Sequence, residues 1–254
     1  MLMFMRGFYN SAQAMIVKQR ELDAVSNNIN NINTPGYRKD EVTLNTFMDE
    51  LIWVQGRRAT HSGTFQQTYV EESRTNLEQS SLEFTYSRFD FAIHGDVYFN
   101  ITDRAGNTYQ SRAGQFELDN EGYLCLGRSG RLQGVNGDIY VGHDDFVVNT
   151  DGTIVNTDGE LIAQLLLTYI PPDAPAVDVL KIGDNLISYV GGAEMPEGER
   201  FDIIQGAFEK SNVDANKEMV KLLELQRMFE ANSAILKAFD MINSRSADLA
   251  KLNR

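Results

Sequence analysis

Residues 207–254 read AFEKSNVDANKEMVKLLELQRMFEANSAILKAFDMINSRSADLAKLNR and contain neither glycine nor proline. Near the other end, residues 8–32, FYNSAQAMIVKQRELDAVSNNINNI, lack both as well. Glycine and proline interrupt helices more strongly than any other residues. Both ends are therefore predicted to form long helices, and nearly every glycine lies in the middle of the chain between them.

The apolar residues of both terminal stretches recur at heptad spacing. Phe8, Met15, Leu22 and Ile29 stand seven residues apart, which predicts a narrow apolar seam. In the C-terminal stretch Met228, Ile235, Ile242 and Leu249 also stand seven residues apart, and flanking apolar residues make this stripe wider than one partner helix would cover. We therefore predict an assembly interface that consists of Phe4, Phe8, Met15, Leu22, Ile29, Leu222, Leu225, Phe229, Ile235, Phe239, Ile242 and Leu249.

The energetics of these helices favour assembly over isolated folding. Each large apolar side chain contributes about 1.5–3 kcal/mol when fully buried, and ordering costs about 1.5 kcal/mol per residue. A single seam cannot offset the ordering of a whole helix. We therefore expect the terminal helices to be largely disordered in a free monomer and to fold among several neighbours. The alternative is an ordinary helical hairpin that closes one globular domain.

The middle of the chain has the pattern of short strands. From about residue 66 onward, short apolar or alternating runs are separated by Gly-Asn, Asn-Gly and Asp-Gly turns. The predicted class is α+β, with long N- and C-terminal helices forming a coiled-coil-like pair, a central antiparallel all-β domain and an extended connector. The predicted boundaries are 1–37 for the N-terminal assembly helix and Asn-rich turn, 38–88 for the connector, 89–200 for the β domain and 201–254 for the C-terminal assembly helix with its lead-in.

Charge is concentrated in the middle of the chain. The net charge is −13, and residues 41–210 carry eleven basic and twenty-seven acidic side chains, whereas both ends are close to neutral. This balance disfavours nucleic acid, whose phosphates need a basic footprint. It fits near-neutral ends that are buried against partners, although an acidic surface that only aids solubility explains the charge equally well. No segment is apolar enough to predict a membrane span, and no cleavable secretion signal is evident.

No motif predicts catalysis or a cofactor. His61, His94 and His143 are isolated in the sequence, Cys125 is the single cysteine, and the phosphate-binding glycine motifs are missing. The repeated Asn-Thr-Asp-Gly of residues 149–159 lacks the spacing of a calcium loop. We therefore expect no enzyme, metal or cofactor. A carbohydrate-binding or adhesin β domain with an oligomerising coiled coil remains an alternative.

A resemblance to a known family rests on motifs at both ends. Residues 22–37, LDAVSNNINNINTPGY, closely resemble the N-terminal signature of the bacterial flagellar rod and hook family. Residues 205–214 and 226–232 resemble its C-terminal signature, and residues 89–95, 116–124 and 181–186 resemble blocks of its β domain. Its motif turn comprises Asn27, Asn28, Asn33, Thr34, Pro35, Gly36 and Tyr37, and this turn predicts either a hinge or a simple helix stop.

The resemblance implies a structural subunit of the flagellar basal-body rod, exported without signal cleavage. Such a subunit polymerises through its terminal helices into a helical axial tube that transmits torque from motor to hook. Its implied partners are copies of itself, other axial rod and hook proteins and the flagellar export apparatus. The length fits two rod proteins, and residues 226–230 favour the distal rod over the proximal one. The stiffening segment of a distal rod protein would fall near residues 46–63.

Overall fold

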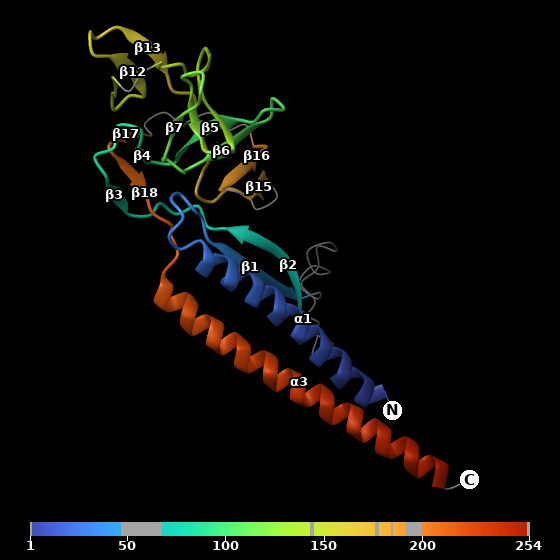
Figure 1. The fold of residues 1–254 in the computed structure, drawn as a ribbon. Helices are drawn as coiled ribbons and strands as arrows, with labels where there is room; N and C mark the ends of the chain where they lie inside the picture. Colours follow the sequence, from blue (N-terminus) through green and yellow to red (C-terminus); the bar gives the residue numbers. More distant parts are fainter. Residues whose placement is uncertain are drawn as a thin grey trace. The chain divides into compact units, whose positions relative to one another are not determined.

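The computed structural model describes residues 2–46, 68–142, 145–175, 178–183, 185–191 and 200–252. These residues form two compact units. Unit 1 comprises residues 1–30, 40–74 and 214–254, and unit 2 comprises residues 31–39 and 75–213. Figure 1 shows helices in the first unit and short strands in the second. His61, His143 and nearly all of the predicted stiffening segment lie outside the described residues.

Unit 1 contains the two helices found in the described part of the chain. Helix α1 spans Leu2–Asn30 and packs along helix α3, which spans Ala215–Leu252. Strands β1 (Asp40–Thr46) and β2 (Thr68–Thr75) pair with each other, and β1 also packs against α1. Val17 and Val25 of α1 and Leu225 of α3 are buried. These few side chains are the apolar centre that the described residues give to unit 1.

Local sequence explains where α3 begins. The Asp214 carboxylate accepts hydrogen bonds from the backbone N–H groups of Asn216 (3.0 Å) and Lys217 (3.2 Å). These bonds satisfy donors that have no partner inside the helix, and they lower the pKa of Asp214, with the Lys217 N–H as the largest cause. The absence of glycine and proline after residue 206 then lets the helix continue for ten turns.

Unit 2 is built on a nine-stranded antiparallel sheet. Its main path runs β15-β16-β6-β5-β9-β8-β7, while β10 pairs with β9 and β14 pairs with β5. The strands are β5 (Val97–Thr102), β6 (Thr108–Ser111), β7 (Glu117–Leu118), β8 (Leu124–Leu126), β9 (Gly130–Gly134), β10 (Gly137–Asp138), β14 (Leu167–Tyr169), β15 (Val179–Ile182) and β16 (Leu186–Tyr189).

Smaller sheets complete unit 2. A three-stranded sheet has the order β11-β12-β13, and two pairs join β17 with β4 and β18 with β3. Phe91, Phe99, Phe116 and Phe146 contact one another in the core, which also contains the fully buried Ile154. The strands are β3 (Leu82–Phe84), β4 (Phe91–His94), β11 (Phe146–Val148), β12 (Thr153–Asn156), β13 (Leu161–Gln164), β17 (Asp202–Gln205) and β18 (Ala207–Glu209).

The predicted coiled-coil-like pair of helices is wrong, although an α+β fold with terminal helices and an antiparallel β domain is what the structure has. In a coiled coil the heptad side chains insert into holes of the partner helix. Here the heptad residues Met228, Ile235 and Ile242 of α3 are 49%, 45% and 46% exposed. The apolar stripe of α3 is too wide for one neighbouring helix to cover.

Residues 38–88, predicted to form an extended connector, contain three strands in their described parts. Residues 40–46 and 68–75 form the β1–β2 pair, and residues 82–84 form β3, which pairs with β18 near the other end of the chain. Apolar and polar residues alternate only weakly in these segments. Because the segments are rich in polar side chains, apolar periodicity did not predict the strands. Backbone pairing with a partner that is remote in sequence, rather than a local signal, fixes β3.

Candidate assembly site

The residues predicted for the assembly interface are only partly covered within unit 1. On α1, Phe8 is 36% exposed, and Met15, Leu22 and Ile29 are half-buried. On α3, Leu225 is 4% exposed, Ile235 and Ile242 are exposed, and the side chains of Leu222, Phe229 and Phe239 are half-buried. The side chains of Phe4 and Leu249 lie outside those described. The interface role of this set stays a prediction.

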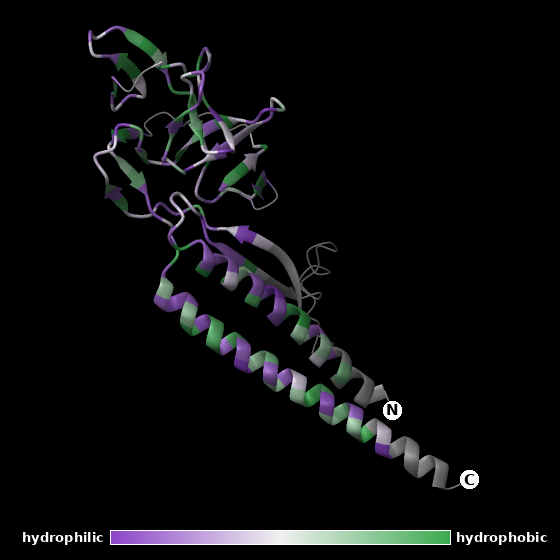
Figure 2. Cartoon of the chain, viewed as in Figure 1, coloured by the Kyte–Doolittle hydropathy of each residue, from purple (hydrophilic) through white to green (hydrophobic). Residues whose placement is uncertain are grey.

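Helix α3 exposes further apolar residues that the sequence analysis did not select. Met219, Val220, Leu223 and Met241 are 54%, 57%, 52% and 57% exposed. At 3.6 residues per turn, Leu223 and Met241 lie on the same face of the helix, five turns apart. Figure 2 shows apolar segments recurring along the described part of α3. The absence of a clean polar face was the signal in the sequence that could have identified these residues.

Apolar residues therefore occupy most of the circumference of α3. Met228 lies about 140° around the helix axis from Leu223, and the buried Leu225 lies beyond it at about 200°. Exposed apolar side chains on several sides of one helix favour burial against other protein. Within unit 1, the structure buries one side of α3 and leaves apolar groups on two others.

Asn28, a residue of the motif turn near the end of α1, forms two hydrogen bonds with the first residue of β1. Its side-chain amide donates to the Asp40 carbonyl at 3.0 Å, and its side-chain oxygen accepts from the Asp40 N–H at 2.9 Å. The Asn28 amide thus bonds both the N–H and the carbonyl of Asp40, as a backbone neighbour does in an antiparallel strand pair. Asn28 is 1% exposed, whereas the neighbouring Asn27 is exposed.

The second half of the motif turn is built into unit 2. The Gly36 N–H donates to the Glu209 carbonyl at 2.7 Å, and the φ angle of Gly36 is +67°. A Cβ at Gly36 would lie 2.2 Å from the backbone nitrogen of Ala113. Glycine is therefore required both by the backbone angle and by the close approach of another segment.

Side chains of β15 and the following turn hold the same segment from another direction. The Lys181 Nζ lies 3.7 Å from the centroid of the Tyr37 ring and donates to the Arg38 carbonyl at 2.8 Å. The Asn185 amide donates to the Pro35 carbonyl at 2.9 Å. Residues 35–38 are thus fixed through both backbone and side chains. Asn33, which precedes them, is exposed, and Thr34 bonds to the Asn31 side chain.

Two arginines and one glutamate form a buried ionic cluster in unit 2. Arg38 and Arg112 contact the two carboxylate oxygens of Glu209 at 2.8 and 3.2 Å, and all three side chains are at most 2% exposed. The Arg112 guanidinium also lies 4.4 Å from the Tyr98 ring centroid. Burial lowers the pKa of Arg112, and the nearby Tyr98 and Glu209 oppose that shift. A charge buried in this way depends on its partners.

Asn212 joins the same region just before α3. Its side-chain oxygen accepts from the Lys39 N–H at 2.7 Å, and its amide donates to the carbonyls of Asn76 and Glu78 at 3.1 and 3.2 Å. The segments that leave α1, enter β3 and lead to α3 are therefore tied together within unit 2. We call Arg38, Arg112, Glu209 and Asn212 the junction.

Sequence reasoning missed the junction. Glu209 and Asn212 lie inside the C-terminal motif and Arg38 directly follows the N-terminal one, but nothing in the sequence pairs them with Arg112. Among the residues that the structure describes, no cluster of His, Cys, Asp and Glu could hold a metal ion. In the same residues no helix is long and apolar enough to cross a membrane.

Fold and junction define a class of protein: a subunit with two long terminal helices in one unit and an antiparallel β domain in the other, in which the junction joins the segment after α1 to the segment before α3. Comparison with known families agrees with this. Residues 8–38 match the family described as flagella basal body rod protein, residues 92–144 match the flagellar hook protein FlgE/F/G D1 domain, and residues 204–249 match the C-terminal domain of flagellar basal body rod FlgEFG proteins. Arg38, Arg112 and Glu209 come one from each matched segment.

Known relatives carry the identification further. The chain is 30% identical to the flagellar basal-body rod protein FlgG of Bacillus subtilis, over 97% of this chain and 100% of the relative. It is 28% identical to the rod protein FlgF of Mesorhizobium japonicum, over 90% and 91% of the two chains. It is 25% identical to the rod protein FlgG of Borreliella burgdorferi, over 93% and 95%.

The chain belongs to the flagellar basal-body rod protein family. It is a structural subunit of the rod and is located in the flagellar basal body. Proteins of this family assemble with other axial components of the flagellum.

Proposed function

We propose that this subunit polymerises through the exposed faces of its terminal helices into a helical tube that transmits torque from motor to hook. The observation that carries the proposal is the apolar surface of α3. Met219, Val220, Leu223 and Met241 are each more than half exposed. Covering the exposed part of each would contribute about 1 kcal/mol, and the same helix is repeated in every copy along the rod.

Torque transmission requires that the ends of a subunit do not slip relative to its β domain. In unit 2 the junction ties the segment after α1 to the segment before α3 through hydrogen bonds and two buried ion pairs. Close-packed protein interiors deform little under load. The junction therefore acts as the stiff base of both helices, and the subunit has a mechanical rather than a chemical role. We infer that it is not an enzyme.

The particular rod position and partners extend this proposal. Residues 226–230, in the exposed middle of α3, support a distal rod subunit, and FlgG proteins are among the relatives. Its partners would be copies of itself, the neighbouring rod and hook proteins, and the flagellar export apparatus that delivers it. Rod length in a strain that lacks the protein tests the position: loss of the distal segment alone supports it, and loss of the whole rod contradicts it.

Substitution on α3 tests the assembly proposal. The triple variant Val220→Gln, Leu223→Gln and Met241→Gln removes apolar surface without placing charge on the helix. We expect it to remain monomeric in sedimentation at concentrations where the parent chain forms polymers. The matched control replaces the exposed charged residues Lys221 and Glu224 by Gln and should polymerise normally. Normal polymerisation of the triple variant would contradict the proposal.

A further inference from the structure

The turn between β9 and β10 contains the only Asn-Gly step of the chain, Asn136-Gly137. Asparagine is one of the chemically labile residues of proteins. The backbone nitrogen of the following residue can attack its side-chain carbonyl, and glycine leaves the most room for this attack because it has no Cβ. Two Asp-Gly steps, at residues 151–152 and 158–159, can close the same ring. The structure distinguishes the three steps.

The Asn136 side chain is free to react. It is exposed, and it makes no hydrogen bond or ion pair among the described residues. Gly137 is exposed as well, and a Cβ built on it would meet nothing within 4 Å. Gly137 pairs with Gly134, but β10 consists of two residues only, and both are exposed. A brief local opening of this short pair therefore frees the Gly137 nitrogen.

The two Asp-Gly steps are less reactive. In the first, the Gly152 N–H donates to the Asn149 carbonyl at 3.0 Å, and the Asp151 carboxylate accepts the Thr153 N–H at 3.0 Å and the Thr153 hydroxyl at 2.7 Å. These bonds lower the pKa of Asp151, with the Thr153 hydroxyl as the largest cause. In the second, the glycine N–H donates to the Asn156 carbonyl at 3.1 Å. An ionised carboxylate is also a poorer target for a nucleophile than a neutral amide, because it already carries negative charge.

We propose that Asn136 deamidates spontaneously, which makes the β9–β10 turn a site of covalent modification. The Gly137 nitrogen bonds to the side-chain carbonyl carbon of Asn136 and loses its proton, and the side-chain amide group leaves as ammonia. The product is a cyclic imide. Water then adds to one of the two imide carbonyls and breaks its bond to nitrogen. The chain then carries either an ordinary aspartate or an isoaspartyl link, in which the backbone runs through the side-chain carbons.

A change in the backbone of this turn reaches the core of unit 2. Strand β10 leads directly to Ile139, which is 1% exposed. The Ile139 N–H donates to the Leu132 carbonyl at 3.1 Å, and the Ile139 carbonyl accepts the Leu124 N–H at 3.0 Å. An isoaspartyl link lengthens the backbone between β9 and β10. It therefore disturbs the register that places Ile139 in the core.

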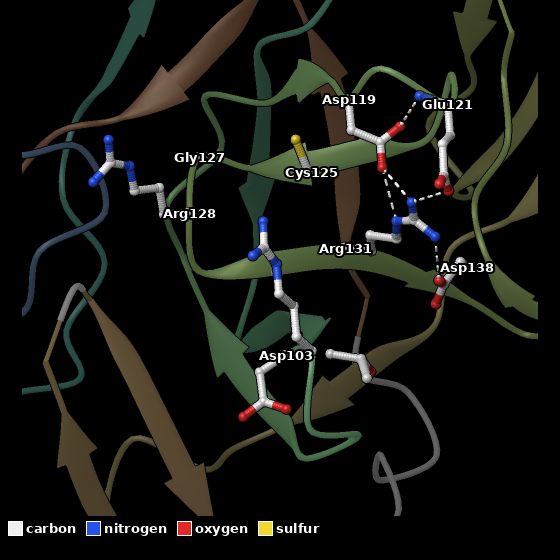
Figure 3. A pocket seen from close by; sticks show the side chains of 11 residues that line it. Asp103, Asp119, Glu121, Cys125, Gly127, Arg128, Arg131 and Asp138 are labelled. Carbon is white, nitrogen blue, oxygen red and sulfur yellow. Dashed lines mark hydrogen bonds and ion pairs between the residues drawn. The ribbon is translucent and has the colours of Figure 1, made fainter.

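Both products also add a negative charge close to an acidic cluster. Arg131 contacts the carboxylates of Asp119, Glu121 and Asp138, and Figure 3 shows these three groups around its guanidinium. A further carboxylate two residues before Asp138 increases the repulsion between like charges in this region. Deamidation thus weakens unit 2 through its charge and, where the isoaspartyl link forms, through its backbone.

Ageing of the full-length chain tests the site. No Lys or Arg lies between residues 131 and 181, so trypsin releases residues 132–181 as one peptide that contains all three steps. After incubation of the folded chain at mildly alkaline pH, mass spectrometry of this peptide should show deamidation at Asn136 about tenfold faster than at Asn149 or Asn156. Asn136→Gln should remove the fast product. A rate at Asn136 no higher than at the other two asparagines would overturn the proposal.

A second Asn-Gly step separates the effect of sequence from that of structure. Thr157→Gly creates such a step at an asparagine that is held in place, because the Asn156 side-chain oxygen accepts the N–H groups of Asp158 and Glu160, both at 2.9 Å. In the folded variant Asn136 should deamidate several times faster than Asn156, whereas in denaturant the two should react at similar rates. Equal rates in the folded variant would contradict the selection of Asn136 by the structure.

Denaturation of fresh and aged chains tests the consequence for unit 2. Chains that carry the isoaspartyl link, identified by isoaspartyl-specific methylation, should unfold at lower denaturant concentration than fresh chains. Asn136→Asp adds the charge without lengthening the backbone, and its midpoint should lie between the two. Aged chains as stable as fresh ones would contradict the effect on Ile139. None of these measurements depends on polymerisation, so the proposed function is tested separately.

Discussion

Helix α3 and the core of unit 2 differ in how far their apolar side chains are exposed. Ile101, Leu124 and Leu132 are fully buried in unit 2, whereas Met219 and Leu223 of α3 are more than half exposed. A buried apolar side chain stabilises the fold that contains it, and an exposed one can only stabilise a complex. We therefore expect unit 2 to carry the stability of the chain and α3 to carry assembly, so that mutations can separate the two roles.

The largest expected effect is at the junction. Glu209→Gln keeps the shape of the side chain but leaves Arg38 and Arg112 buried without a counter-charge, which should destabilise unit 2 by about 3–5 kcal/mol. Chemical denaturation followed by far-UV circular dichroism measures this loss of unfolding free energy. The control is Glu83→Gln, which breaks the exposed ion pair with Lys210 (2.7 Å) and should cost less than about 1 kcal/mol. Equal stability of both variants would show that the buried cluster is not essential.

A matched pair of leucines tests the comparison directly. Leu132→Ala should destabilise unit 2 by about 2–5 kcal/mol because it leaves a cavity in a packed core. Leu223→Ala should change monomer stability by less than about 0.5 kcal/mol and should weaken polymerisation instead. Denaturation and sedimentation of both variants give the two readouts. The separation of roles fails if Leu223→Ala destabilises the monomer as much as Leu132→Ala does.

Gly36 should have the next largest effect. Gly36→Ala must adopt a positive φ and press against the backbone of Ala113, so we expect a loss of about 2 kcal/mol or more in unit 2. Gly106→Ala has a similar backbone angle with nothing within 4 Å of the added Cβ, and it should cost only about 1 kcal/mol. Melting of the two variants side by side checks the difference. A loss no greater for Gly36→Ala than for Gly106→Ala would mean that the turn can move away from Ala113.

The smallest expected effect is a pH dependence at the start of α3. Because the pKa of Asp214 is lower in the folded chain, its capping contribution is present above the unfolded pKa and is lost as pH falls through the folded pKa. Asp214→Asn keeps a capping side chain without this titration. Helix content measured by circular dichroism from neutral to acidic pH should therefore fall slightly more in the parent than in the variant. Parallel curves would exclude Asp214 as the cause.

Sequence predicted the family, the function and the helical ends because these depend on local signals. Freedom from glycine and proline marks 207–254 as helix, and the motif of residues 22–37 is specific. The heptad spacing of Met228, Ile235 and Ile242 was misleading, since spacing alone does not reveal how many neighbours a stripe needs. The domain boundaries and the interface residues stay predictions.

The pairing of Arg38 and Arg112 with Glu209 in the junction could not be predicted from one sequence. Arg38 and Glu209 are separated by most of the chain, and Arg112 belongs to a strand end in between. Each is a charged residue that would ordinarily be assigned to the surface. They come together through long-range contacts: β18 pairs with β3, and the Gly36 N–H in the segment after α1 bonds to the Glu209 carbonyl. Such contacts have no local signal in the sequence.

Hydrogen exchange on the full chain is the most direct test of the claim that sister molecules cover α3. In dilute monomer we expect the amides of residues 219–241 to exchange rapidly while the β5, β8 and β9 amides of unit 2 stay protected. In the polymer, protection should extend through α3. Full protection of residues 219–241 in the dilute monomer, unchanged on polymerisation, would contradict the account.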